Sequence, residues 1–199
     1  MAAVTRPSAP SSPFLRGAQV YLRSPQRADA PVFVAAALAS RRLHGRWVQA
    51  PSTVEAFHAY VARFGRRTVA VERLQRVGLL AFRHDDDALV GAFNLGDIIR
   101  GAFCSAYLGY FAFAPHAGQG YMTEGIELAL RHAFSGLGLH RVEVNVQPTN
   151  LRSLALAERA GFVREGYSPR YLRIAGRWRD HVRHALLVED WRARRKARR

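Results

Sequence analysis

The stretch Ala117-Gly118-Gln119-Gly120-Tyr121-Met122-Thr123-Glu124 follows an apolar, aromatic run at residues 106–113 and opens an amphipathic helical pattern. Glycine adopts backbone angles that other residues avoid, so Gly118 and Gly120 allow the main chain to approach a bulky anion closely. The following helix points free N–H groups and the positive end of its dipole at the same place. The stretch therefore predicts a strand, a pyrophosphate-binding loop and a helix, in that order.

Two common nucleotide sites do not fit this loop. No acidic residue closes the strand pattern at residues 141–146, where a dinucleotide site places one for the ribose hydroxyl. The loop also lacks the Lys-Ser/Thr pair of a nucleoside-triphosphate loop, which argues against metal-assisted phosphoryl transfer. We therefore expect the diphosphate to be the handle of a carrier molecule rather than the reacting group.

The hydrophobic pattern on either side of the loop predicts an α/β (α+β) fold, a mixed sheet with helices on both faces. The expected strands cover residues 19–23, 77–83, 89–99, 104–113, 141–146, 162–172 and 179–188. The expected helices cover residues 28–39 and 53–64, a segment from 121 to about 134, and a segment opened by Thr149-Asn150 and closed by Gly161.

Length and composition predict one domain, because 199 residues with 49% hydrophobic residues suffice for one core. Residues 1–13 are rich in Ala, Ser and Pro, so we expect a disordered tail followed by a domain at 14–190. Residues 191–199 carry six positive charges and predict a solvated, frayed basic tail. The alternative is a docking tail for a ribosomal or other polyanionic partner.

Cysteine and hydropathy indicate where the protein works. Cys104 is the only cysteine, which excludes an internal disulfide and fits a reducing compartment. The longest apolar stretch, residues 30–39, is too short to span a bilayer and shows no cleavage site. We expect a cytoplasmic protein without membrane contact, and no metal, because the aspartates at 85–87 next to His84 suit a solvated turn.

The net charge of +15 leaves two readings open. Lys196 is the only lysine among 30 Lys and Arg residues, and such a skew reflects genome composition as readily as function. Cationic surfaces also attract the phosphates of nucleic acid, so docking on ribosomal RNA stays an alternative. Charge alone does not decide between them.

Several motifs in one order resemble a known superfamily, the GNAT acetyl-CoA-dependent N-acetyltransferases, and within it the RimJ/RimL-type ribosomal-protein-alanine N-acetyltransferases. The similarity covers about residues 15–191. Besides the loop it rests on Tyr107-Leu108-Gly109-Tyr110, Leu139-His140-Arg141-Val142, Asn150-Leu151-Arg152-Ser153, Ala160-Gly161-Phe162-Val163-Arg164-Glu165-Gly166-Tyr167 and Trp178-Arg179-Asp180-His181.

The resemblance implies a mostly antiparallel central sheet that splays between its fourth and fifth strands, with acetyl-CoA as cosubstrate. Pantetheine would lie in the splay, and a freed backbone N–H would polarise the thioester carbonyl. An amine would attack directly, without a covalent enzyme intermediate. The implied cofactor-binding residues are Phe111, Phe113, Gly118, Gln119, Gly120, Tyr121, Met122, Thr123, Asn150 and Ser153.

The implied catalytic positions are Ser153, whose hydroxyl would protonate the departing thiolate, and Asn145. Relatives often carry a glutamate base where this chain has Asn145 or Arg170, so the base stays open between Glu143 and a water chain. Ser153 and Asn150 have a second reading as residues that only cap a helix. The implied substrate-binding residues are Trp47, Arg170, Tyr171 and His181.

The acceptor follows from the missing carboxylate base. An α-amine with a pKa near ~7.8 is roughly one-fifth neutral at about pH 7.2, whereas a lysine amine near ~10.4 is neutral in about one molecule per thousand. This favours the N-terminal amine of a protein, and the resemblance implies a ribosomal protein. The alternatives are a small-molecule amine such as an amino sugar, polyamine or amino acid, and a basic nucleic-acid- or ribosome-binding module without catalysis. The sequence is compatible with a monomer or a homodimer.

Overall fold

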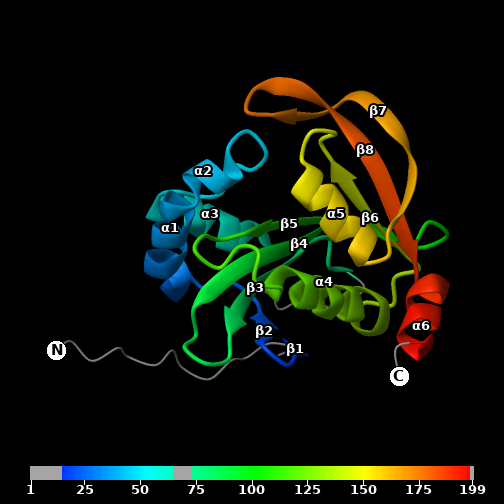
Figure 1. The fold of residues 1–199 in the computed structure, drawn as a ribbon, viewed down its shortest axis with the longest axis horizontal. Helices are drawn as coiled ribbons and strands as arrows, with labels where there is room; N and C mark the ends of the chain where they lie inside the picture. Colours follow the sequence, from blue (N-terminus) through cyan, green and yellow to red (C-terminus); the bar gives the residue numbers. More distant parts are fainter. Residues whose placement is uncertain (1–14, 65–72, 198–199) are drawn as a thin grey trace.

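A single sheet organises the molecule in the computed structural model, which describes residues 15–64 and 73–197 (Figure 1). Its strands lie in the order β1-β2-β3-β4-β5-β6-β8-β7. They are β1 (Leu15–Arg16), β2 (Val20–Arg23), β3 (Val77–Arg83), β4 (Leu89–Ile99), β5 (Ser105–Ala112), β6 (Arg141–Val146), β7 (Val163–Ile174) and β8 (Arg177–Leu187).

The helices are η1 (Arg27–Asp29), α1 (Ala30–Ala39), α2 (Arg41–His44), α3 (Val54–Phe64), α4 (Tyr121–Arg131), the π-helical turn η3 (His132–Gly136), α5 (Leu151–Arg159) and α6 (Val188–Ala197). The sequence predicted the bounds of β3, β4 and β6 correctly and missed the short elements β1 and α2. Residues 1–13, expected to be a disordered tail, lie outside the described residues.

All neighbouring strands pair antiparallel except β5 and β6, which pair parallel. The expected mixed, mostly antiparallel sheet is therefore confirmed. A parallel pair needs a crossover connection, and here the loop at 113–120 and α4 supply it. This crossover brings the N-terminal end of α4 to the sheet.

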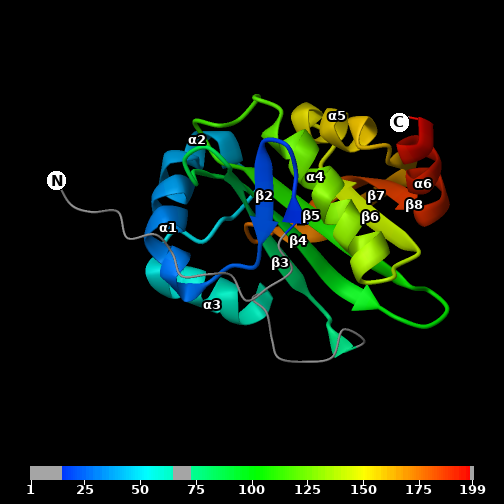
Figure 2. The ribbon, with the colours of Figure 1, turned by 90° about the horizontal axis from the view of Figure 1, so that it is seen from below.

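Strand alternation divides the core into two layers, one on each face of the sheet. On one face Phe93 of β4 packs under α4 and α5 with Ile126 and Ala129. On the other face Leu80 of β3 packs with Phe33 of α1 and Phe57 of α3. Figure 2 shows α1 and α3 on the side of the sheet away from α4 and α5, so the helices cover both faces.

Helix α4 lies close to the sheet because residue 125 is glycine. A Cβ at Gly125 would stand 2.5 Å from a ring carbon of Phe93. Real Cβ atoms do not approach so closely, so glycine is required here for packing, despite a cost of about 1 kcal/mol in a helix interior. This close approach fixes the start of α4 relative to β4.

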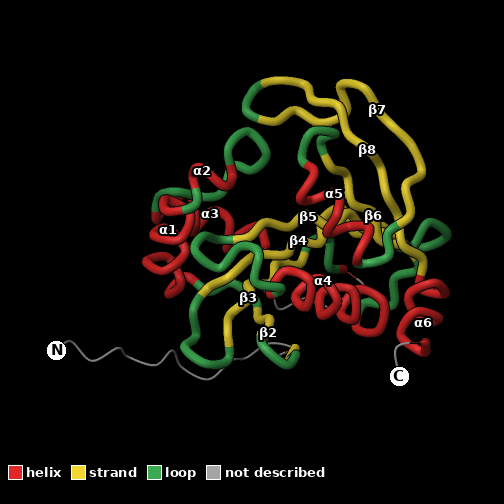
Figure 3. Tube along the Cα trace, in the orientation of Figure 1, coloured by secondary structure: helices red, strands yellow, loops and turns green. Residues whose placement is uncertain are grey.

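The β7–β8 hairpin extends beyond the rest of the sheet and turns at Ala175-Gly176 (Figure 3). Both turn residues have positive φ, 50° and 76°. The hairpin, α2 and the start of α5 stand around the same open edge of the molecule in Figure 1.

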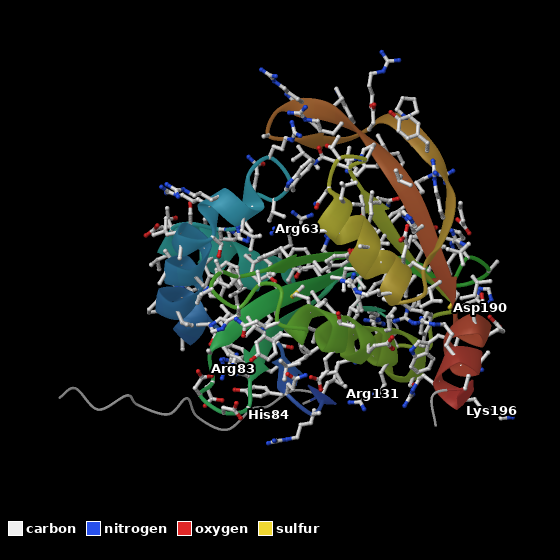
Figure 4. The ribbon with its side chains drawn as sticks, in the orientation of Figure 1. Arg63, Arg83, His84, Arg131, Asp190 and Lys196 are labelled. Atoms are coloured by element: carbon white, nitrogen blue, oxygen red, sulfur yellow. The ribbon has the colours of Figure 1, made fainter. Side chains whose placement is uncertain are left out.

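The C-terminal segment differs from the expected frayed tail. Trp191 is 3% exposed, and its ring centroid lies 5.2 Å from that of Phe134. Arg194 donates to the carbonyls of Ala160 and, at 2.9 Å, Arg159, which close the end of α5. The prediction of a solvated tail from residue 191 was wrong because α6 carries an apolar anchor. Its charged end still reaches the surface at Lys196 (Figure 4).

A search of the helices in the described residues finds none that is both long and apolar enough to cross a membrane.

Candidate active site

The loop before α4 has the backbone that a phosphate cradle requires. Gly118 and Gly120 have φ of +84° and +88°, in the left-handed region. A Cβ at either glycine would meet no atom within 4 Å among the described residues, so the space around the loop is open. Gly120 is the N-cap of α4, and no side chain caps it. The first N–H groups of the helix thus stay available for an anion.

The side chains of the loop do not all face that space. Met122 points into the sheet, since a Cβ at Gly91 would stand 2.4 Å from its sulfur. The Gln119 amide donates to the carbonyl of Pro115 at 3.1 Å. Met122 therefore contributes to the cradle only through its backbone, as the main-chain mode of binding requires.

The Tyr121 ring lies near one guanidinium group and one imidazole ring. The guanidinium carbon of Arg83 lies 5.5 Å from the Tyr121 ring centroid, and the His116 ring lies 6.4 Å from it. Figure 4 places Arg83 and His84 at the end of β3. The positive charge of Arg83 therefore lies close to the first residue of α4.

Glu124 has a structural partner. Its carboxylate accepts the backbone N–H groups of Ala18 and Gln19, the latter at 3.1 and 3.2 Å. Glu124 therefore anchors the β1–β2 turn on the first turn of α4, and it also complements the helix dipole.

The sheet splays where the resemblance implied. β5 and β6 pair only through Ser105↔Arg141, Ala106↔Val142 and Tyr107↔Glu143, although β5 continues to Ala112 and β6 to Val146. Beyond Tyr107 the facing edges of the two strands separate. Such an edge offers unpaired backbone groups to a ligand that can mimic a strand.

The freed end of β5 is held by the α1–α2 corner instead of by β6. Ser40, fully buried, accepts the N–H of Ala114 at 2.9 Å and donates to Ala36 O at 2.6 Å. His44 Nε2 lies 2.8 Å from the carbonyl oxygen of Ala112, so this nitrogen donates. Together with the pairing of Ala112 with Gly91 of β4, these bonds anchor the end of β5 where β6 does not pair with it.

The splay opens into a cleft of about 230 Å³. It brings together six of the residues that the sequence singled out: Trp47, Phe111, Asn145, Asn150, Ser153 and His181. Leu172 and Ile174 of β7 close its outer side. The cleft therefore lies between β5, β6, the start of α5, the segment after α2 and the β7–β8 hairpin.

Asn150 and Ser153 form the cap of α5, and both line the cleft. The Asn150 side chain accepts the N–H of Ser153 at 3.3 Å, as an N-cap does. The Ser153 hydroxyl donates to the phenol oxygen of Tyr110 at 3.1 Å, and that phenol donates to the Ser153 carbonyl at 3.0 Å. Burial raises the pKa of Tyr110 to about 12, so it stays protonated at neutral pH.

Tyr110 was missed as a functional residue. It belongs to the quoted Tyr107–Tyr110 motif, but it stands 43 residues before Ser153, and no local pattern joins the two. Only the packing of α5 over β5 brings them together.

Asn145 faces the cleft with an unused acceptor. Its side-chain oxygen is buried and has no hydrogen-bond partner among the described residues. An amide oxygen accepts from an ammonium but does not remove its proton. This geometry fits a residue that orients an amine rather than a base.

Besides the six loop residues at 118–123, three predicted residues lie outside the lining of the cleft. Phe113 is fully buried against Phe33 of α1, and its N–H donates to Val90 O at 2.9 Å, so neither its ring nor its N–H faces the cleft. The Arg170 N–H donates to Asp180 at 2.7 Å. Tyr171 lies beside His181, with ring centroids 5.9 Å apart.

The described residues fit coenzyme A in two independent places. The open space at Gly118 and Gly120 accommodates a diphosphate at the tip of α4, and the unpaired edges beyond Tyr107 accommodate the pantetheine amides. No cluster of metal ligands is found in the part of the chain that the structure describes.

A phosphate-binding helix tip beside a splayed parallel strand pair is the arrangement of acetyltransferases of the GNAT class. The family model described as acetyltransferase (GNAT) domain matches residues 19–163, and the chain belongs to this family.

Individual relatives agree with the family. The chain is 44% identical over 109 residues to the probable N-acetyltransferase YjcK of Bacillus subtilis, covering 55% of this chain and 60% of that protein. It is 40% identical over 110 residues to the ribosomal protein uS5 alanine N-acetyltransferase of Escherichia coli, covering 55% and 57%. The matches thus span less than two thirds of these two relatives.

A solved structure covers more of the chain. The structure of Mycobacterium smegmatis RimJ in complex with CoA-disulfide superposes with a TM-score of 0.73 at 28% identity, over 85% of this chain and 82% of that one.

Proposed function

We propose that this protein transfers the acetyl group of acetyl-CoA to the N-terminal α-amine of a protein, with a ribosomal protein that begins with alanine as the substrate. The observation that carries the proposal is the opening of the sheet between β5 and β6 into a cleft that also receives Asn150 and Ser153. The 40% identity to the ribosomal protein uS5 alanine N-acetyltransferase supports the choice of substrate.

The loop before α4 and the cleft would perform different tasks. The N–H of Thr123 donates to Gly120 O at 2.9 Å, so backbone N–H groups from Gly118 to Met122 would hold the diphosphate, and Asn150 would hold the pantetheine arm. Ser153, hydrogen-bonded to Tyr110, would deliver a proton to the departing sulfur. Asn145 and His181 lie where an acceptor amine would enter.

The charge of the β7–β8 hairpin favours a protein N-terminus over a polyamine. Arg177 is paired with Ile174, and Arg179 with Leu172. Cross-strand partners point to the same face, so both arginines share the face of two residues that line the cleft. A polycation would be repelled there, whereas a peptide carries one amine and tolerates acidic residues further along.

Thiol release measured with three acceptors tests the proposal. A peptide that begins with alanine should release free thiol from acetyl-CoA, whereas the same peptide with a blocked N-terminus and a free lysine should release little. Spermidine and an amino sugar serve as the third acceptor class. Faster release with either small amine than with the peptide would replace the proposed substrate class, and no release with any amine would contradict catalysis.

Mass spectrometry of ribosomal proteins identifies the substrate. Cells that lack this gene should lose one acetyl increment, about 42 mass units, on one ribosomal N-terminus. A binding module without catalysis would leave every N-terminus unchanged. Its binding to nucleic acid would fall steeply with salt, and acetyl-CoA would not compete.

A further inference from the structure

His181 is a buried histidine whose ring lines the acceptor cleft. It is 2% exposed and follows Arg177 and Arg179 at alternate positions on the same face of β8. Buried polar side chains need a partner or a function. In the sequence it had only been assigned to substrate binding.

The contacts of the ring determine which nitrogen carries the proton. Nδ1 lies 3.0 Å from the carbonyl oxygen of Arg179. A carbonyl oxygen only accepts, so in the neutral ring Nδ1 carries the hydrogen and the lone pair is on Nε2. The ring is thus held as the tautomer whose basic nitrogen is Nε2.

The surroundings of the ring keep it neutral at pH 7. Burial lowers the pKa of His181 from its ordinary value, against weaker opposing effects of the Arg179 carbonyl and the Asp180 carboxylate. Asp180 accepts hydrogen bonds from the Tyr167 hydroxyl and the Arg170 N–H.

One phenol packs against the ring, and a second phenol lies next to the first. Tyr171 of β7 packs against it, and its hydroxyl lies 3.3 Å from that of Tyr107 of β5. The hydrogen bond to Tyr171 and burial raise the pKa of Tyr107 to about 12. Tyr107 therefore stays uncharged at neutral pH, where it does not draw a proton onto the ring.

We propose that Nε2 of His181 is the general base that removes a proton from the acceptor ammonium. The inference rests on the proposed acetyl transfer. Glu143, which the sequence left open as the base, accepts a hydrogen bond from Arg141 Nε at 2.8 Å, whereas Nε2 of His181 is unprotonated in the neutral ring. Asn145 lies on the neighbouring strand β6, opposite Arg183, and would accept a second N–H of the acceptor nitrogen and orient it.

The protons and electrons balance as follows. His181 Nε2 takes one proton from the ammonium and later passes it to solvent, which frees the nitrogen lone pair. The nitrogen forms a bond to the acetyl carbonyl carbon, and the carbon–sulfur bond breaks with its electron pair going to sulfur. The nitrogen gives its second proton to solvent, sulfur takes one proton from the Ser153 hydroxyl, and that hydroxyl regains one from solvent, so one thiol and one net solvent proton result.

The test compares H181N with H184N across pH. The amide nitrogen of an Asn side chain overlays Nδ1, so H181N keeps the donor to Arg179 O and removes only the base. His184 is a matched control, since it is 1% exposed on the same strand and does not line the cleft. For both variants and the wild type, kcat/KM with the alanine peptide is measured from pH 6 to pH 9.5.

We expect H181N to lose about tenfold in kcat/KM at pH 7, because only roughly one-seventh of an α-amine with a pKa near ~7.8 is neutral there and can react without a base. The loss should shrink to within about threefold at pH 9.5, where an α-amine with a pKa near ~7.8 is already neutral. H184N should keep the wild-type pH profile. An equal loss at both pH values, or no loss at pH 7, would overturn the role of His181.

Two further measurements distinguish failure of the acetyl-transfer proposal from failure of the role proposed for His181. A wild-type protein that acetylates no amine overturns both proposals, whereas an active wild type matched by H181N overturns only this one. Long-range ¹H–¹⁵N NMR of the wild type gives the ring state without any assay or variant. We expect Nδ1–H and an unprotonated Nε2 at pH 7, and a charged ring or the opposite tautomer would contradict the proposal.

Discussion

Ser153 and Tyr110 form a reciprocal pair in which the serine hydroxyl donates to the phenol at 3.1 Å and the phenol donates to the serine carbonyl at 3.0 Å. The pair ties the first turn of α5 to β5 on the edge of the cleft. The tyrosine thereby fixes the rotamer of the hydroxyl that is proposed to protonate the leaving sulfur.

Removal of the Tyr110 hydroxyl should slow turnover through Ser153. We expect Y110F to lower kcat about tenfold and S153A about 10²-fold, with acetyl-CoA affinity within about threefold of wild type in both. The double variant should be no slower than S153A, because the phenol acts through the serine. Additive losses in kcat would show that the two side chains act independently.

The effect of Tyr110 ionisation on the rate of acetyl transfer has a predictable direction. Burial raises the pKa of Tyr110 to about 12, above its ordinary value, so the protonated phenol persists until the pH approaches that value. The rate of wild type should therefore show no Tyr110-linked change between pH 6 and pH 10. A basic limb near pH 9 that disappears in Y110F would contradict this.

Substitutions at Gly120 should separate backbone strain from occlusion of the cradle. Alanine fits the empty space and costs about 1 kcal/mol for the left-handed φ, so G120A should still bind coenzyme A. The long arginine side chain of G120R should fill the cradle and abolish binding, while the fold persists. Calorimetric titration with coenzyme A measures both, and near-normal affinity in G120R would remove the loop from the site.

The α1–α2 corner should control the splay. S40A leaves the buried N–H of Ala114 without its acceptor, so we expect about 1–3 kcal/mol less stability and a raised KM for acetyl-CoA. Urea unfolding and steady-state kinetics measure the two effects. Exposed Ser52 is the control, and S52A should change neither quantity. A normal KM in S40A would mean that β5 keeps its position without this bond.

Helix α6 should contribute to stability through Trp191. W191A removes a buried side chain packed on Phe134, which should cost about 3–5 kcal/mol in urea unfolding. The indole N–H has no partner among the described residues, so W191F should cost clearly less than W191A. A loss of less than about 1 kcal/mol in the free energy of unfolding of W191A would show that α6 is only loosely attached.

The sequence predicted most elements because their signals are local. The alternating pattern at Arg141–Val146 and the cap at Asn150 each lie within a few residues, and both were placed correctly. α6 was missed because one buried tryptophan among six charges produces no apolar stripe. The resemblance implied Phe113 as a cofactor residue, and strand position alone does not reveal that its side chain turns into the core.

By itself, the sequence determined the order of strands and helices, the glycine loop before α4 with Gly118 and Gly120, and the family, since these depend on short-range spacing and backbone preference. Only the tertiary structure determined which side chains meet in and around the cleft. Ser40 reaches Ala114 across 74 residues and Ser153 reaches Tyr110 across 43. Hydrogen bonds at such separations, and the burial that holds His181 neutral, arise only when distant segments pack together, so no local pattern encodes them.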